Sequence, residues 1–178
     1  WLGTGLKALD HAMEAIWAIN PHPVSTVLAR ESIEKLVSNL PLSVDKDNEG
    51  RLEAVYQCQL GAWLGVSACL NTGGRLSHTL GHQIGGHWGV PHGHTSCVVL
   101  PHVMQRLAPD TLVQQQCIAD TFHVAPELSP QERMDITVKR FTAFIRELGL
   151  PSRLGETGAN RETIANVARG VVLELKHQ

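Results

Sequence analysis

The sequence predicts an all-α protein, a multi-helix bundle folded as one domain. Apolar residues recur every three or four positions in successive segments, and most of these segments stop at glycine or proline. No segment alternates apolar and polar residues between hairpin turns, as a strand would. A length of 178 residues suits one domain with a full core. We therefore expect about eight helices and no strand.

The chain opens with two predicted helices. The first covers residues 6–20, where one stripe of apolar residues ends at Asn20-Pro21. The second covers residues 24–40, because Pro23 suits the first turn of a helix and Pro41 is expected to stop it. The short run before residue 6 looks like the end of a connection, so we expect the chain to belong to a larger protein.

A polar loop over residues 43–50 separates these helices from a third, which covers residues 51–70. This segment is the most apolar helix, and its small residues would let neighbouring helices approach closely. We expect it to be the central helix of the core, with Trp63 as a core or pocket-wall residue. Residues 71–74 (N-T-G-G) predict a helix stop and a turn.

The second half of the chain predicts four further helices. One covers residues 93–107, with a kink expected at Pro101, and the next covers residues 110–124. The helix over residues 129–148 begins with a serine cap, a proline at the first position and a glutamate at the third. After a loop, the last helix begins at Asn160 and ends near Gln178.

Composition excludes several classes of partner. The net charge is −2 and there is no basic run, so neither nucleic acid nor an anionic membrane is the expected partner. The most apolar run is interrupted by polar residues, which favours a buried helix over a membrane span. The four cysteines lie far apart in the sequence, which favours reduced, buried thiols and a cytoplasmic location.

Residues 76–102 hold six of the ten histidines. They are His78, His82, His87, His92, His94 and His102. On a helix, His78 and His82 lie one turn apart and share a face. Glycines 85–86 and the glycine-containing segment 89–93 are expected to break the helix and fold the later histidines back toward this pair.

Three kinds of site compete as explanations of the His78-x-x-x-His82 pair. A zinc protease needs a glutamate directly after the first histidine, and that position is Thr79. A haem or structural site lacks its attachment or cysteine motif. What remains is an open imidazole-rich site that binds Fe²⁺ or Zn²⁺, or the same cavity used without a metal.

Several motifs resemble one known family. They are T-G-L-K-A-L-D-H-A-M-E-A at residues 4–15, H-T-L-G-H-Q-I-G-G at residues 78–86, and P-H-G…V-V-L-P-H at residues 91–102. In this order the motifs resemble the C-terminal helical domain of the iron-containing (group III) alcohol dehydrogenases, which has a dehydroquinate-synthase-like fold. Within the family, the sequence is most similar in appearance to the maleylacetate reductases.

The resemblance implies an NAD(P)-dependent oxidoreductase that transfers a hydride between NAD(P)H and the carbonyl or alcohol of a small substrate. Family members place an α/β nucleotide-binding domain before the helical domain. This chain has no glycine-rich strand-turn-helix fingerprint of its own, so residues 1–178 are expected to form the helical half alone. The expected partners are therefore the nucleotide-binding domain of the same parent protein, a small-molecule substrate and a second copy in a homo-oligomer.

The resemblance also assigns site residues. The family's metal is held by an aspartate and a histidine four residues apart on the first helix and by two later histidines, which correspond to His11, His78 and His92. The position of the aspartate is Lys7, whose protonated amine cannot be a ligand. Maleylacetate reductases also replace that aspartate and are thought to work without metal.

We therefore predict that Lys7 supplies the positive charge that a metal supplies in the relatives, and that the substrate is anionic. His82 matches the histidine that lies beside the nicotinamide, so it is the predicted cofactor contact and proton donor. Its alternative role is that of a neutral imidazole buried in a helix pair. Two alternative functions remain: an Fe²⁺- or Zn²⁺-dependent alcohol dehydrogenase completed by another carboxylate, and a non-catalytic helical module.

Overall fold

The computed structural model describes residues 1–72 and 76–176, and within these ranges every regular element is helical. The elements are α1 (Leu2–Ile16), α2 (Pro23–Val44), α3 (Arg51–Thr72), α4 (Leu76–Trp88), α5 (His92–Thr121), α6 (Pro130–Glu147), the short 3₁₀ turns η1 (Leu154–Thr157) and η2 (Arg161–Thr163), and α7 (Ile164–Leu175). The all-α prediction is confirmed. No helix in the described part of the chain is both long and apolar enough to cross a membrane.

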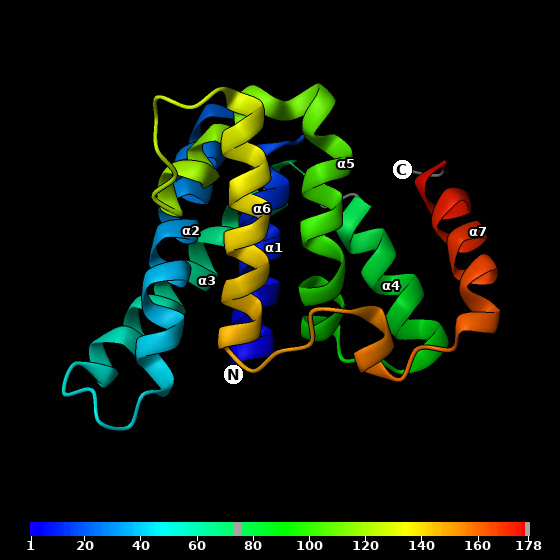
Figure 1. Ribbon diagram of the computed structural model, residues 1–178, viewed down its shortest axis with the longest axis horizontal. Helices are drawn as coiled ribbons and strands as arrows, with labels where there is room; N and C mark the ends of the chain where they lie inside the picture. The colour runs from blue at the N-terminus through cyan, green and yellow to red at the C-terminus, as the bar shows by residue number, and fades with distance from the viewer. Residues whose placement is uncertain (73–75, 177–178) are drawn as a thin grey trace.

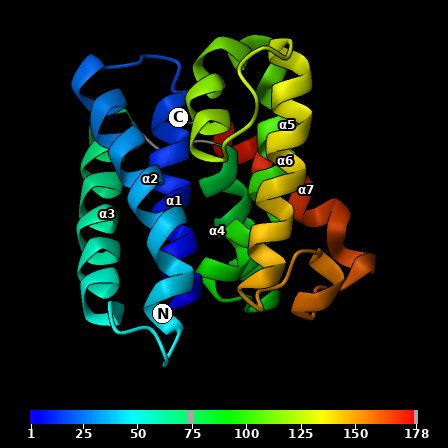
Figure 2. The ribbon, with the colours of Figure 1, turned by 60° about the vertical axis from the view of Figure 1, so that its left-hand side comes forward.

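Helix α1 is the centre of the bundle. It packs against α2, α3 and α5, and the views in Figures 1 and 2 place α2 and α3 on one side of it and α4 and α7 on the other. Every residue from Leu6 to Ile16 except His11 is buried, so the helix is enclosed on nearly all sides. Helix α6 packs on α5, and α7 packs on α4 at the edge of the molecule.

The prediction that residues 51–70 form the central helix is wrong. Helix α3 buries only small residues and cysteines, while Leu52, Trp63 and Leu70 are 82%, 65% and 80% exposed. Trp63 is therefore not a core residue. The predicted close approach is nevertheless present, because a Cβ added at Gly65 would lie 2.8 Å from the backbone oxygen of Ala8 on α1.

Two predicted helix boundaries are also corrected. Pro41 lies inside the last turn of α2, whose final residues are anchored where Trp1 Nε1 donates to Ser43 Oγ at 2.8 Å. Residues 93–107 and 110–124 form one element, α5, with Pro101 and Pro109 inside it and non-helical angles at Thr111. The predicted turn over residues 71–74 and the end of the last helix lie partly outside the described residues.

Helix α4 contradicts the predicted glycine break, and helix α6 confirms the predicted N-terminal cap. Helix α4 continues through Gly85 and Gly86, contrary to the predicted break, and the chain turns at Gly89, whose φ of 67° favours glycine. At the start of α6, Ser129 and Glu132 form the predicted capping box. The four cysteines are free thiols, as predicted.

Candidate active site

Three helices bring the predicted site residues together. Helix α1 carries Lys7 and His11 one turn apart, α4 carries His78 and His82, and α5 begins at His92. Glycines make these helices meet closely: a Cβ at Gly81 on α4 would lie 3.2 Å from Cε1 of His92. A Cβ at Gly93 would lie 2.2 Å from the backbone oxygen of Gly3, so the start of α5 rests directly on α1.

Four of the predicted histidines form one cluster. The ring centroids of His11 and His78 are 4.9 Å apart, and those of His82 and His92 are 5.6 Å apart, both pairs being stacked. His78 lies 6.4 Å from both His82 and His92. The sequence motifs on three separate helices therefore converge.

The other three histidines of residues 76–102 lie away from this cluster. His87 is exposed and hydrogen-bonds through Nδ1 to the backbone oxygen of Gln83 at 2.9 Å. His94 is half-buried beside Gly3. His102 is exposed within α5, at the edge of an apolar cavity between α4, α5 and α7.

Lys7 is buried and paired. Its Nζ donates to Asp10 Oδ2 at 2.9 Å, and Ser96 Oγ on α5 donates to the same oxygen at 2.6 Å. Lys7 is 9% exposed and Asp10 is fully buried. Burial alone raises the pKa of Asp10, but the charges of Lys7 and His78 and the hydrogen bond from Ser96 outweigh it and hold the pKa below its usual value. The pair is therefore an ammonium and a carboxylate.

Glu14 orients His78. Its Oε1 accepts from the backbone N–H of Ser77 at 2.7 Å, and its Oε2 makes a short hydrogen bond with His78 Nδ1. Because an ionised carboxylate only accepts, Nδ1 of His78 carries the proton, and Nε2 is the ring nitrogen left for the site. A carboxylate behind a site histidine fixes its ring orientation and tautomer.

The charge of Lys7 affects the pKa values of two neighbouring histidines. Burial, and after it the charge of Lys7, lowers the pKa of His11 to about 4, so this imidazole is neutral at pH 7. The same two causes lower the pKa of His92. The cluster therefore places the ammonium of Lys7 beside two imidazoles, His11 and His92, whose neutral forms are favoured and can donate or accept hydrogen bonds.

A hydrogen bond to the last helix, α7, holds the side chain of His82. Its Nδ1 lies 3.0 Å from Glu174 Oε1 on α7, and Gln83 Nε2 donates to Glu174 Oε2 at 3.0 Å. These two hydrogen bonds lower the pKa of Glu174. The side chain of His82 is 55% exposed, so it is not the buried imidazole of the alternative interpretation.

Sequence reasoning missed Asp10, Glu14, Ser96 and Glu174 as members of this site. A signal existed for the first two: carboxylates four residues apart on a helix with an apolar stripe lie close to the face that is buried. No sequence signal links Ser96 or Glu174 to the cluster, because each comes from a helix far along the chain. Their contacts depend on the packing of α5 and α7.

The donors around Lys7 do not suit a divalent cation held by His11, His78 and His92. The fourth corner expected from the family pattern is a protonated amine, which has no lone pair and repels a cation. Asp10, Glu14 and His78 each have a possible ligand atom, and these atoms lie within 4.8 Å of one another. In the described part of the chain, no other group of three or more His, Cys, Asp or Glu residues meets this distance. The fourth corner of the three-histidine set is therefore an ammonium, and its charge is balanced by the carboxylate of Asp10.

Comparison with known proteins places this site in context. Residues 2–177 match the model of the Fe-containing alcohol dehydrogenase family, C-terminal. Maleylacetate reductase from Sphingobium indicum is 37% identical over 111 residues, which are 61% of this chain and 30% of that protein. Lactaldehyde reductase from Escherichia coli is 29% identical over 170 residues, which are 95% of this chain and 44% of that protein.

Solved structures show the same fold. The crystal structure of a 1,3-propanediol oxidoreductase superimposes with a TM-score of 0.89 at 25% identity, over 96% of this chain and 44% of that one. Maleylacetate reductase from Rhizobium sp. superimposes with a TM-score of 0.82 at 24% identity, over 96% of this chain and 45% of that one. The chain thus spans less than half the length of these relatives.

Proposed function

Because the chain belongs to the Fe-containing alcohol dehydrogenase family, we propose that it supplies the helical half of an active site that reduces the carbonyl group of a small anionic substrate. The family supports an oxidoreductase, and several of the similar proteins are maleylacetate reductases. The observation that carries the finer proposal is the buried ammonium of Lys7 beside four clustered histidines. The proposed activity resembles that of a maleylacetate reductase and needs no metal.

The cofactor is proposed to be NAD(P)H, bound mainly by a nucleotide-binding domain of the parent protein. When bound, it supplies the hydride. The residues of this chain then have to bind the substrate oxygen, stabilise its developing negative charge and provide a proton.

Lys7 is the proposed electrostatic catalyst. Its ammonium is fixed by Asp10, so it needs no reorganisation when negative charge develops on the carbonyl oxygen. His11 and His92 are held neutral beside it and offer hydrogen bonds without adding charge. A carboxylate on the substrate would be attracted by the same ammonium, which is why an anionic substrate is proposed.

His82 is the proposed proton donor and nicotinamide contact. Glu174 accepts from Nδ1, which leaves Nε2 as the nitrogen that exchanges protons with the site or with solvent. Its exposed position suits exchange with solvent. His78, fixed by Glu14, has the same bonding pattern deeper in the cluster.

The test uses the polypeptide that joins this chain to a nucleotide-binding domain, with maleylacetate as substrate and NADH oxidation as the readout. Lys7→Ala should lower kcat by at least about 100-fold, the usual effect of removing one group that stabilises an oxyanion. Lys35→Ala is the matched control, because Lys35 is also an ion-paired lysine but lies on α2 beside Glu31. Activity of Lys7→Ala within about twofold of the unaltered protein would contradict the proposal.

The alternative of a non-catalytic module is tested by ligand binding. Stabilisation of the joined polypeptide by NADH, measured as a rise in Tm, is expected if this chain completes a cofactor site. His82→Ala should reduce that rise while leaving the Tm without NADH nearly unchanged, because its side chain is exposed. No rise in Tm with NADH would favour the module.

A further inference from the structure

Helix α1 buries two carboxylates near one another. Asp10 is fully buried and Glu14 is 2% exposed. Carboxylates so far from water are stable only when cations or hydrogen-bond donors compensate them. Glu14 has the backbone N–H of Ser77 and the imidazole of His78, and Asp10 has Ser96 and the ammonium of Lys7.

One oxygen of this group is unsatisfied. Asp10 Oδ2 receives both Lys7 and Ser96, whereas Asp10 Oδ1 is buried and has no hydrogen-bond partner among the described residues. A buried carboxylate oxygen without a partner is costly in a native structure and has the lone pairs that a cation needs. Ligand atoms of Asp10, Glu14 and His78 all lie within 4.8 Å of one another.

We propose that Asp10, Glu14 and His78 form a cation pocket whose resident cation is the protein's own Lys7 ammonium, and that shortening Lys7 opens the pocket to one divalent transition metal. This site shares only His78 with the set that the family pattern predicts. The proposal goes beyond the proposed reaction and does not depend on turnover.

The donor set selects the kind of metal. Two carboxylate oxygens and one imidazole nitrogen suit Zn²⁺ or Co²⁺, which bind such atoms at about 2.0–2.2 Å. Tetrahedral bonds of that length separate ligand atoms by roughly 3.4 Å. The short hydrogen bond between Glu14 and His78 must therefore open, and the ligand atoms, which all lie within 4.8 Å of one another, must adjust to that separation. Ca²⁺ is disfavoured because it needs six or more oxygen ligands.

Lys7 explains why the pocket would not hold a metal in the unaltered chain. Its ammonium lies 2.9 Å from Asp10 Oδ2, where it neutralises one of the two carboxylates that would attract a cation. A second cation in the same buried space would be repelled at short range. Removing the ammonium restores the negative charge of Asp10, whose Oδ1 has no hydrogen-bond partner among the described residues and is left for coordination.

The experiment measures Co²⁺ binding to the purified chain by isothermal titration calorimetry and by the visible absorption of tetrahedral Co²⁺. Four proteins are compared: the unaltered chain, Lys7→Ala, Lys7→Ala with Asp10→Asn, and Lys35→Ala. Lys35 is the control for simple loss of a lysine, since it pairs with Glu31 outside the cluster. Circular dichroism and a thermal melt establish that each protein is folded.

We expect Lys7→Ala to bind one Co²⁺ per chain at least about 100-fold more tightly than the unaltered chain. The double variant should lose that gain, and Lys35→Ala should match the unaltered chain. Stoichiometric binding by the unaltered chain, a folded Lys7→Ala without the gain, or a gain that survives Asp10→Asn would each overturn the proposal.

If Lys7→Ala does not fold without metal, Lys7→Ser keeps a polar group beside Asp10 and replaces it in the same comparison. Refolding of either variant by Co²⁺ or Zn²⁺, but not by Ca²⁺, would support the proposal, because a metal that binds only the folded state stabilises it. Failure of both metals to refold either variant would overturn it. None of these readouts involves activity, so a failure here leaves the proposed reaction to its own test.

Discussion

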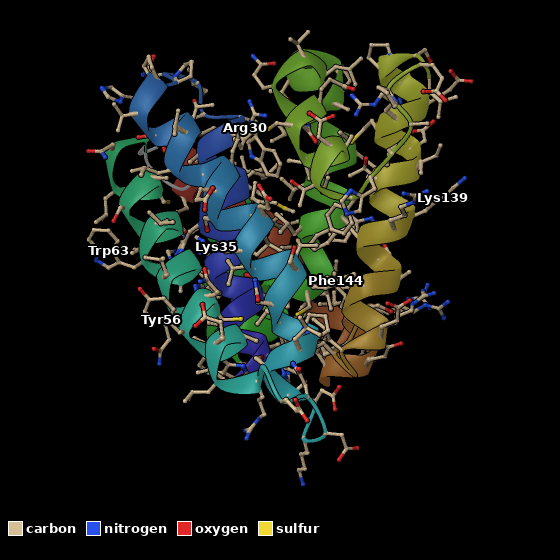
Figure 3. All side chains as sticks on the ribbon, turned by 90° about the vertical axis from the view of Figure 1, so that its left-hand side faces the viewer. Arg30, Lys35, Tyr56, Trp63, Lys139 and Phe144 are labelled. Carbon is tan, nitrogen blue, oxygen red and sulfur yellow. The ribbon has the colours of Figure 1, made fainter. Side chains whose placement is uncertain are left out.

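Helices α1 and α3 lie side by side and distribute their residues in opposite ways. Helix α1 buries Lys7, Asp10 and Glu14, while α3 has no charged residue from 54 to 72 yet exposes apolar side chains such as Tyr56 and Trp63 (Figure 3). Hydrophobicity alone therefore does not place a helix in the core. Charges can be central when they pair with one another, and an exposed apolar helix face is typical of a surface that another partner covers.

The largest effect should come from breaking a buried pair on α1. Asp10→Ala leaves the Lys7 ammonium buried without its carboxylate, so the free energy of unfolding should fall by about 3–5 kcal/mol, measured by urea denaturation. Glu31→Ala is the matched control, because the Glu31 side chain is 51% exposed in its pair with Lys35 and should cost less than about 1 kcal/mol. Equal losses in the two variants would mean that burial of the α1 charges has no special cost.

The next effect tests the contact between the two helices. A Cβ at Gly65 would lie 2.7 Å from Ser32 Oγ and 2.8 Å from the backbone oxygen of Ala8, so Gly65→Ala should destabilise the protein by about 1–3 kcal/mol. At Gly86 on α4 a Cβ meets nothing within 4 Å, so Gly86→Ala should stabilise by about 0.5–1 kcal/mol. Thermal melts of both variants check the prediction, and a neutral Gly65→Ala would contradict the close packing of α1 and α3.

A smaller, electrostatic effect concerns His11. Its pKa of about 4 lies below the ordinary 6.5, so the stability that its neutral form contributes is present above pH 6.5 and is lost as the pH falls toward 4. Lys7→Met removes the second cause of the shift, so NMR titration should find a higher pKa for His11 that remains below 6.5 because burial persists. Lys35→Met should leave the titration unchanged. If the pKa of His11 is the same with and without Lys7, the charge of Lys7 does not lower it, and the prediction is wrong.

The smallest effect is expected on the exposed face of α3. Leu70 is 80% exposed, so Leu70→Ala should change the free energy of unfolding by no more than about 0.5 kcal/mol. Leu9 on α1 is fully buried, and Leu9→Ala should cost about 2–5 kcal/mol. Urea denaturation measures both variants. Similar losses in the free energy of unfolding would contradict the contrast between the two helices.

Local signals predicted much of the fold. The capping box at Ser129 and the helical phase of His78 and His82 are confirmed because each depends on residues within one or two turns. The same local rules placed a stop at Pro41 and a break at Gly85-Gly86, and both are wrong. A proline or glycine weakens a helix by a limited amount, and tertiary packing supplies more than that.

The candidate site was predicted only in part, for the same reason. Family motifs identified Lys7, His11, His78, His82 and His92, and the structure brings the four histidine rings together. The partners Ser96 and Glu174 could not be found, because they join the site across helices separated by up to 92 residues in the chain. The prediction that residues 51–70 form the central helix failed for a related reason, since α3 is apolar on its exposed face as well as on its buried one.

We propose that the Lys7 ammonium replaces the metal ion in this active site. The most direct test is the carbonyl reductase activity of the polypeptide that joins this chain to a nucleotide-binding domain, measured with NADH before and after exhaustive dialysis against a chelator. Metal content is followed by mass spectrometry on the same samples. We predict unchanged kcat in protein that contains less than about 0.05 metal ions per chain, since the proposed oxyanion stabilisation comes from the charge and hydrogen bonds of Lys7 and not from a Lewis acid. Loss of activity on chelation, with recovery on adding Fe²⁺ or Zn²⁺, would contradict the claim.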